Sequence, residues 1–410
     1  MVTPKATPGI GRRRIPAPRQ VASLIQFPKP GQSGLERRLA RAASIADLRD
    51  LARRAAPGPI FDYVDGGAGD ETAVRRNVDA FRAARFIPRT LRDVSVIDPS
   101  VELLGQRYPL PLVLGPIGLA RSAHADGEIG SARAAGRAGV PYTLSTMAAE
   151  PPEKIAEFAP DTERWFQLYL WKDHDASAAL LDRAKAAGFT TLVFTVDVAV
   201  AGDRHRDVRN GLTFPPSVPL RTAMRIATRP RWWFDAITRD PLTFAAIQRD
   251  KEDFAGMNRV LDAAATFEDL EWLRGEWPGR IIVKGVVSPA DAVAIRDAGA
   301  DGIIVSNHGG RQLEQAIATL DALPAVRAAV GPDYPLLLDS GIRTGGDIAV
   351  ALAAGADAVM IGRAYMYGLM AGGEAGADRA LQLLADGLRN TMALLGARTI
   401  DELTPDLLAP

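Results

Sequence analysis

One of the four histidines in this 410-residue chain has surroundings suited to catalysis. His308 follows an apolar run and lies in the stretch S-N-H-G-G-R-Q at 306–312, where the glycines let a ligand approach the imidazole. A histidine base needs a partner that fixes its tautomer and stabilises the imidazolium, and Asp197, at the end of another apolar run, could supply it. The alternative is a hydrogen-bonded loop histidine without a catalytic role.

Two arginines near these residues could clamp a carboxylate. Arg204 follows the aspartate closely along the chain, and Arg311 follows the histidine. Guanidinium groups bind carboxylates through paired N–H donors, so two of them together suit such a group. Tyr63 and Tyr169 could add phenolic hydrogen bonds, although packing is the simpler interpretation of each tyrosine taken singly.

Glycines and arginines that follow the last two apolar runs predict a phosphate site. In barrel proteins the last two βα loops commonly bind phosphate through glycine amides and a helix N-terminus. The residues concerned are Gly341, Arg343, Gly345, Gly346, Gly362 and Arg363. The alternative is solvated arginines and glycines that only punctuate helices, and the pattern leaves open whether substrate or cofactor carries the phosphate.

The elements that must position these residues alternate regularly from about residue 110. Nearly continuous apolar runs are typical of parallel strands covered on both faces. The expected strands are Pro111–Gly118, Val140–Thr146, Trp165–Leu170, Thr191–Asp197, Ile281–Val286, Gly302–Asn307, Leu336–Ser340 and Val359–Gly362. Helical spacing of apolar residues predicts helices between them, such as Glu128–Ala138, Ala176–Ala187, Pro289–Ala298 and Gly346–Ala354. Eight β-then-α units indicate a (β/α)8 TIM barrel, with an open doubly wound sheet and a second domain as the alternative.

The polar residues gather at the C-terminal ends of the expected strands, which is where barrel enzymes place catalytic groups. They are Gln167, Tyr169, Thr195, Asp197, Lys284, Ser306 and Asp339. Packing requirements alone do not explain so many polar side chains after apolar strands.

Two regions interrupt the alternation. Residues 35–100 form a helical lead-in, and 198–279 is far longer than an ordinary βα connection. The end of the second region, Phe267–Trp277, is expected to be the fourth barrel helix. The predicted organisation is a flexible arm at 1–34 and a single domain at 35–410, with an insertion at about 198–266 after the fourth strand.

Composition excludes several classes of protein. The chain has 49 basic and 49 acidic side chains, which argues against nucleic-acid binding driven by bulk charge. The absence of cysteine excludes disulfides, thiolate metal sites and cysteine nucleophiles, and we expect no metal. No apolar run approaches the ~18 residues that span a bilayer, and no apolar signal region follows the basic N-terminus, so we expect a cytoplasmic protein.

Six stretches, in order along the chain, resemble the FMN-dependent α-hydroxy-acid dehydrogenase and oxidase family. The resemblance covers about Leu35–Leu403, and S-N-H-G-G-R-Q is its most specific part. The other stretches are F-D-Y-V-D-G-G-A at 61–68, W-F-Q-L-Y at 165–169, F-T-V-D at 194–197, K-G at 284–285 and D-S-G-I-R at 339–343. Three short segments are most similar to the bacterial respiratory L-lactate dehydrogenases: L-S-T at 144–146, D-S-G at 339–341 and A-G-G-E-A-G at 371–376.

The resemblance implies FMN as cofactor and His308 as the base, held by Asp197. It also implies that Arg204, Arg311 and Tyr63 bind the substrate carboxylate and that Tyr169 lies near the substrate hydroxyl. Further implied residues are Lys284 at the flavin N1–C2 edge, Pro116, Ile117 and Gly118 against the ring, Ser145, Gln167, Thr195 and Ser306 at its polar edge, and Asp339, Gly341, Arg343, Gly362 and Arg363 at the phosphate.

Three residues depart from family patterns. Ile117 stands where many members have threonine, and Met147 stands where plant glycolate oxidases have tryptophan, which leaves the preferred substrate open. Gly118 stands where some oxidases have alanine, which points toward a dehydrogenase.

The implied reaction is oxidation of a small L-2-hydroxy acid, foremost L-lactate to pyruvate, with quinone or another respiratory acceptor. An oxidase that releases hydrogen peroxide and a mandelate-type dehydrogenase stay open within the family. Outside it, the alternatives are a degenerate barrel scaffold and a lyase or isomerase acting on a phosphorylated substrate. The basic, tryptophan-containing stretch at about 216–247 predicts peripheral contact with the inner face of the cell membrane, or alternatively a lid or subunit contact. Relatives imply a homotetramer.

Overall fold

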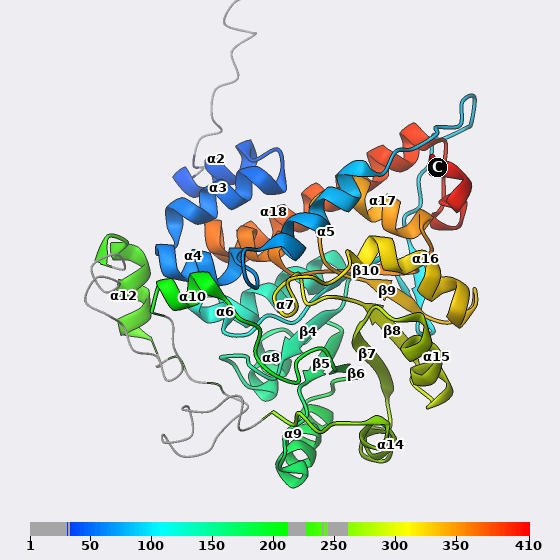
Figure 1. The fold of residues 1–410 in the computed structure, drawn as a ribbon. Coiled ribbons are helices and arrows are strands. Elements are labelled where there is room, and N and C mark those ends of the chain that lie inside the picture. The colour runs from blue at the N-terminus through cyan, green and yellow to red at the C-terminus, as the bar shows by residue number, and fades with distance from the viewer. Residues whose placement is uncertain (1–30, 32, 212–226, 240–241, 243, 245–260) are drawn as a thin grey trace, which may run out of the picture.

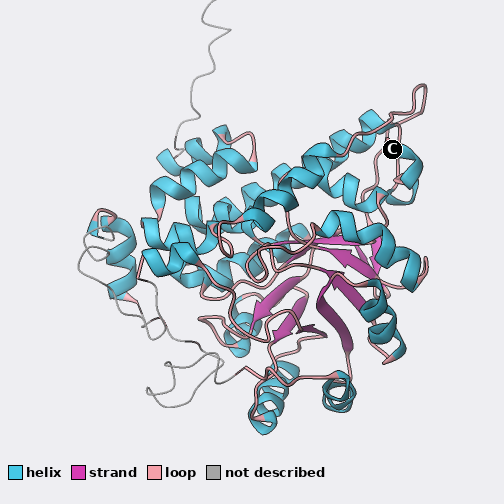
Figure 2. Cartoon of the chain, viewed as in Figure 1, coloured by secondary structure: helices cyan, strands magenta, loops and turns pink. Residues whose placement is uncertain are grey.

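Eight parallel strands close into a barrel (Figures 1 and 2). The structure is a computed structural model that describes residues 31, 33–211, 227–239, 242, 244 and 261–410. The barrel strands are β3 (Leu112–Leu114), β4 (Tyr142–Ser145), β5 (Arg164–Leu168), β6 (Thr191–Thr195), β7 (Arg280–Val286), β8 (Gly302–Val305), β9 (Leu336–Leu338) and β10 (Ala358–Ile361). They pair in the closed order β10-β3-β4-β5-β6-β7-β8-β9. The predicted (β/α)8 TIM barrel is therefore confirmed, and the open sheet is excluded.

Most of the predicted strands end earlier in the structure than the sequence indicates. The expected strand Pro111–Gly118 is reduced to Leu112–Leu114, for example, and Thr191–Asp197 ends at Thr195. Single backbone hydrogen bonds still join the residues just past the strand ends, such as the one from the Val196 amide to the Lys284 carbonyl oxygen at 2.9 Å, and the chain then continues as loops. The site residues thus lie on the loops that leave the strands, as is usual for binding groups on a rigid scaffold.

Helices surround the barrel and follow its strands. They are α6 (Ala120–Ala123), α7 (Gly127–Ala138), α8 (Pro152–Phe158), α9 (His174–Ala186), α14 (Phe267–Glu276), α15 (Pro289–Asp297), α16 (Thr319–Val330), α17 (Gly345–Ala353) and α18 (Arg363–Leu395). The predicted fourth barrel helix is present as α14. The long α18 is kinked at Gly372 and Gly373, whose backbone angles are not helical. Two short 3-10 helices, η2 (Ile400–Glu402) and η3 (Pro405–Leu407), complete the chain.

The predicted helical lead-in is also present. It consists of α2 (Gly34–Arg41), α3 (Ile45–Ala55), α4 (Gly58–Asp65) and α5 (Thr72–Ala83), followed by the antiparallel hairpin of β1 (Val101–Leu103) and β2 (Gln106–Tyr108). In Figure 1 the first helices lie along α18, with which α3 makes extensive contact. The lead-in is therefore packed against the C-terminal helix of the same chain.

The inside of the barrel is divided into an apolar layer and a polar layer. One apolar cluster takes Trp165, Val193, Ile282, Ile304 and Leu337 from consecutive strands, whereas their sequence neighbours belong to the outer core. Because side chains alternate along a strand, the residues two positions further on face the same interior. These are Gln167, Thr195, Lys284, Ser306 and Asp339, all buried. The two-residue alternation along each strand therefore places apolar side chains deep inside the barrel and polar side chains at its C-terminal mouth.

The insertion after β6 contributes two described helices, α10 (His205–Arg209) and α12 (Pro230–Thr238). The predicted membrane-contact stretch at about 216–247 lies partly outside the described residues, as does the predicted arm before residue 31. Among the helices that the structure describes, none is long and apolar enough to cross a membrane.

Candidate active site

The barrel mouth brings His308 and Asp197 together across the space between two strands. Asp197 lies just after β6 and His308 just after β8, and the distance from His308 Nδ1 to Asp197 Oδ1 is 2.9 Å. His308 has a left-handed backbone with φ of 59°, as do Gly309 and Gly310 after it, so the chain turns sharply here. The Ser306 hydroxyl accepts a hydrogen bond from the His308 amide and secures this turn.

The second ring nitrogen of His308 faces the open side of the pair. His308 Nε2 lies 3.4 Å from Tyr169 Oη, and the two rings are nearly parallel with centroids 6.4 Å apart. Since Asp197 occupies Nδ1, Nε2 is the nitrogen at which a proton can be exchanged with a substrate. The arrangement is that of a base with an orienting carboxylate.

Burial and neighbouring charges set the protonation of this cluster. Burial lowers the pKa of His308 and outweighs the opposing effect of Asp197, so the imidazole is neutral at neutral pH. Burial raises the pKa of Asp197, but His308 and Lys284 lower it by more, which keeps the carboxylate ionised. Burial raises the pKa of Tyr169, which therefore remains a phenol able to donate a hydrogen bond.

Two arginines lie at the same mouth of the barrel, and they differ in the hydrogen bonds that hold them. Arg311 Nη1 donates to the carbonyl oxygens of Tyr63 at 2.7 Å and Gly66 at 2.8 Å, and the guanidinium lies 5.1 Å from the Tyr63 ring centroid. Arg204 precedes α10, and its Nε is buried without a hydrogen-bond partner among the described residues. Burial and the positive charge of Arg204 lower the pKa of Arg311. Two guanidinium groups held near each other in a buried place suit an anion that arrives from outside.

A buried lysine lies deeper in the barrel. Lys284 Nζ is 3.0 Å from Asp339 Oδ2 and donates to Ser306 Oγ at 2.9 Å. Burial lowers the pKa of Lys284, but the carboxylates of Asp339 and Asp197 raise it by more, so the ammonium is charged. The mouth of the barrel therefore contains a fixed positive charge beside the histidine pair.

Two polar side chains of the polar layer at the barrel mouth contain a buried atom without a hydrogen-bond partner in the described part of the chain. Gln167 accepts hydrogen bonds from Ser145 Oγ and from the Thr146 amide, yet its Nε2 is buried without a partner among the described residues. The hydroxyl of Thr195 is in the same condition. Buried polar atoms normally find a partner in protein, water or ligand, so these two indicate where a bound group with polar edges belongs.

The loop after β3 borders this space from the other side. Residues Pro116, Ile117 and Gly118 follow the strand directly, and a Cβ added to Gly118 would lie 2.9 Å from Met147 Cβ and 3.6 Å from Tyr63 Oη. The structure thus brings the predicted ring-contacting loop beside Met147 and Tyr63.

The predicted phosphate residues meet at the ends of β9 and β10, but they are not equally available. Gly341 has φ of 100°, and an added Cβ would lie 2.5 Å from the Asn77 carbonyl oxygen. Arg343 Nη1 donates to its neighbour's carbonyl, and its guanidinium lies 5.9 Å from the Tyr367 ring centroid. The Arg363 guanidinium instead donates to the carbonyl oxygens of Val64 at 3.0 Å, Gly309 at 2.8 Å and Gly66 at 2.6 Å. Its side chain is committed to the protein, whereas its backbone follows Gly362 at the start of α18.

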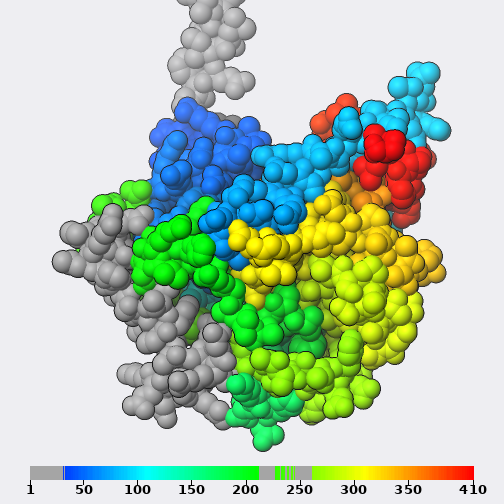
Figure 3. Space-filling model, in the orientation of Figure 1, coloured from blue at the N-terminus to red at the C-terminus, as the bar shows by residue number. Residues whose placement is uncertain are grey.

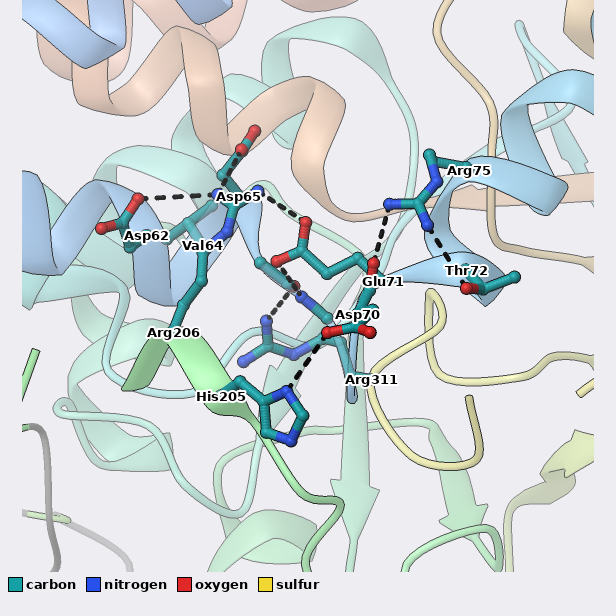
Figure 4. A network of polar contacts seen from close by, with 12 residues as sticks. Asp62, Val64, Asp65, Asp70, Glu71, Thr72, Arg75, His205, Arg206 and Arg311 are labelled. Carbon is teal, nitrogen blue, oxygen red and sulfur yellow. Dashed lines mark hydrogen bonds and ion pairs between the residues drawn. The ribbon is translucent and has the colours of Figure 1, made fainter. Parts of the chain in front are cut away.

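An ion-pair network around Arg206 and Asp65 was not predicted from the sequence (Figure 4). Asp65, at the end of α4, accepts two hydrogen bonds from Arg49, one from Arg206 and one from the Tyr367 hydroxyl. Arg206 also pairs with Glu71. The signal was present in F-D-Y-V-D-G, whose two aspartates served only to mark a motif. Among the described residues, no cluster of histidine, aspartate and glutamate is suited to hold a metal ion.

Comparison with known proteins gives these features a context. The family profile described as FMN-dependent dehydrogenase matches residues 52–410. A Mycobacterium tuberculosis protein provisionally named L-lactate dehydrogenase is 47% identical, with 96% of this chain and 95% of that protein covered. An L-lactate dehydrogenase of Ectopseudomonas mendocina is 41% identical, with 88% of this chain and 97% of the relative covered.

Solved structures agree with the sequence relatives. The crystal structure of the monotopic membrane protein (S)-mandelate dehydrogenase is 39% identical with a TM-score of 0.86, covering 90% of this chain and 99% of that one. A mandelate oxidase structure is 37% identical with a TM-score of 0.77, covering 90% of this chain and 98% of that one.

Proposed function

Because the chain belongs to the FMN-dependent dehydrogenase family, we propose that it oxidises a small L-2-hydroxy acid, with L-lactate to pyruvate as its reaction. The observation that carries the proposal is the His308–Asp197 pair, whose free ring nitrogen faces Tyr169 beside two arginines. A base next to a carboxylate clamp suits a substrate whose reacting carbon is adjacent to its carboxylate.

The polar layer at the C-terminal mouth of the barrel fits FMN. The unpartnered atoms of Gln167 and Thr195 match a ring with polar edges, and Lys284 supplies a buried charge beside them. When bound, FMN supplies a two-electron acceptor for the substrate. The residues that we assign to its binding are Pro116, Ile117, Gly118, Ser145, Gln167, Thr195, Lys284, Ser306, Asp339, Gly341, Arg343, Gly362 and Arg363.

We assign the phosphate contacts to different groups of the two arginines: the backbone amide of Arg363 and the guanidinium of Arg343. The Arg363 guanidinium already has three carbonyl partners, so its contribution is the backbone amide at the N-terminus of α18. Among the described residues the Arg343 guanidinium donates one hydrogen bond, to the Ile342 carbonyl, and it keeps nitrogen donors for a phosphate. Gly341 admits the close approach of the phosphate, because only glycine fits against α5 at that position.

The side chains act on the substrate in a definite order. Arg204 and Arg311 orient its carboxylate, with Tyr63 beside them, so that the α-carbon and its hydroxyl lie against the histidine. His308 Nε2 accepts a proton, and Asp197 stabilises the imidazolium that results. The proton reaches the same nitrogen whether it leaves the α-carbon or the hydroxyl. Tyr169 remains protonated and donates to the substrate oxygen.

We propose that electrons pass on to quinone or another respiratory acceptor at the inner face of the cell membrane. The described part of the insertion supports this: Trp233 and Phe234 on α12 are 37% and 57% exposed. A cavity of about 350 Å³ adjoins the same helix at Trp232 and Asp235, and its lining includes Arg38, Arg54, Arg121, Arg229 and Arg239. Exposed aromatic side chains next to basic ones suit a surface of anionic lipid. The related (S)-mandelate dehydrogenase is described as a monotopic membrane protein.

Vesicle sedimentation tests the membrane contact. Binding to anionic vesicles should weaken with salt and with the double change Trp233→Ser and Phe234→Ser. Phe158→Ser is the matched control, because Phe158 is a 42% exposed aromatic residue on α8. Equal sedimentation of both variants would reject α12 as the contact.

Two alternatives within the family have support from relatives: mandelate as the substrate, and oxygen as the electron acceptor. Mandelate dehydrogenases and oxidases share the fold, and Met147 and Gly118 border the space where substrate size would be set. A panel of L-lactate, glycolate, mandelate and longer 2-hydroxy acids identifies the preferred substrate, and the yield of hydrogen peroxide per keto acid separates oxidase from dehydrogenase.

We also propose a homotetramer, which light scattering would test.

The first experiment is the visible spectrum of the purified protein before and after anaerobic L-lactate. A flavin spectrum that bleaches with L-lactate and not with D-lactate is the expected result. A flavin that stays oxidised would overturn the choice of L-lactate, and a colourless protein that takes up no added FMN would overturn the whole proposal.

A further inference from the structure

We propose that Arg206 is a positioning residue that holds Arg204 at the substrate carboxylate by fastening α10 to α4. The inference rests on the proposed function of Arg204 and Arg311, and nothing in the family resemblance assigns Arg206 a role. We call the fastening the α4–α10 clasp, and it consists of Asp62, Asp65, Glu71, Arg206 and Asn210.

The clasp joins two short helices by charged contacts (Figure 4). Arg206 Nη1 lies 2.9 Å from Asp65 Oδ2, and Arg206 Nη2 lies 2.5 Å from Glu71 Oε2. Asn210, which follows the last residue of α10, donates to Asp62 Oδ2 at 2.8 Å. Both ends of α10 are therefore tied to α4 and to the loop after it.

Backbone contacts extend the clasp toward the substrate arginine. The Gly69 amide donates to the Asp203 carbonyl at 2.8 Å, immediately before Arg204. Arg204 thus lies between two attachments, one at the preceding residue and one at Arg206. In Figure 3 this green segment lies directly against the blue N-terminal helices.

The same end of α4 also anchors the second substrate arginine. Arg311 donates to the carbonyl oxygens of Tyr63 and Gly66, so α4 is the common frame of both guanidinium groups. Arg204 and Arg311 repel each other before an anion arrives, and α10 has only five residues and no buried side chain to resist that repulsion. The clasp supplies the restraint, which preorganises the pair for a carboxylate.

A second arginine on the same carboxylate allows a matched control. Arg49, on α3, donates to Asp65 Oδ1 at 2.6 Å and Oδ2 at 2.8 Å, but within the described part of the chain it makes no hydrogen bond or ion pair with α10. If Arg206 only neutralised Asp65, then Arg49→Met and Arg206→Met would have the same consequences. If Arg206 positions α10, only its own replacement should disturb substrate binding.

The test compares Arg206→Met, Arg206→Lys and Arg49→Met in the FMN-loaded protein. Loss of a contact made equally in ground and transition states raises KM and leaves kcat little changed. We expect Arg206→Met to raise KM for L-lactate and the Kd of oxalate, a planar dicarboxylate probe, by about tenfold or more. Arg206→Lys should restore part of this, and Arg49→Met should keep both constants near wild type while lowering thermal stability.

Hydrogen exchange gives a readout that does not depend on turnover. Backbone amides of residues 203–211 should exchange faster in Arg206→Met than in wild type. Their exchange rates in Arg49→Met should equal those of wild type. Equal exchange in the two variants, or equal KM values, would overturn the positioning role. If no 2-hydroxy acid reduces the wild-type flavin, the proposed function fails, whereas the exchange result still decides whether Arg206 holds α10.

Discussion

Replacing Asp197 by asparagine should slow substrate oxidation while moving its pH dependence in an informative direction. The carboxylate oxygen lies 2.9 Å from His308 Nδ1 in a largely buried pair. Asparagine keeps the shape of the side chain and removes the charge that stabilises the imidazolium. FMN should still bind, because Asp197 holds the histidine rather than the cofactor.

The size of the effect follows from the kind of hydrogen bond that is lost. A hydrogen bond to a charged group contributes about 1.5–3 kcal/mol, and about 1.4 kcal/mol corresponds to a factor of ten. Flavin reduction should therefore slow by roughly 10- to 200-fold. Burial lowers the pKa of His308 and Asp197 opposes this, so the substitution should lower the pKa further. The acid limb of kcat/KM should move to lower pH although the plateau falls.

Anaerobic stopped-flow reduction by L-lactate across pH measures both effects in one experiment. A simple weakening of the site would lower the plateau and leave the acid limb where it is. Reduction at the wild-type rate, or an acid limb that moves to higher pH, would refute the assignment of Asp197 as the partner of a catalytic His308.

Three further predictions concern the same mouth of the barrel. His308→Gln should retain FMN but lose flavin reduction by about 10²- to 10⁴-fold in stopped flow, and near-normal reduction would contradict its role as base. Burial holds the pKa of His308 below its ordinary value of about 6.5, so the unfolded chain binds that proton more readily. The free energy of unfolding should therefore fall as the pH drops below about 6.5, and urea melts at pH 7.5 and 5.5 should show a smaller fall for His308→Gln. Gly341→Ala should lose FMN and thermal stability, because its Cβ would meet the α5 backbone at 2.5 Å in a left-handed conformation, whereas Gly275→Ala on α14, where an added Cβ meets nothing within 4 Å, should keep both.

The sequence by itself determined the barrel and the line of polar residues at its mouth. Apolar runs of strand length alternate with helical spacing, and this local periodicity survives in the structure because parallel strands must be covered on both faces. The two layers inside the barrel follow from the same rule. Lys284 lies two residues after Ile282, and Thr195 two after Val193, so an apolar residue and a polar one share an interior face.

Only the tertiary structure decided which of the charged groups are available to a ligand. Arg343 and Arg363 look alike in sequence, yet three carbonyls of distant segments occupy the Arg363 guanidinium. Asp65 and Arg206 are 141 residues apart in sequence, and no spacing rule joins them. Such pairings depend on where the lead-in helices pack against the barrel. That packing is set by many weak contacts over the whole chain, so local pattern predicts the candidates and the fold selects among them.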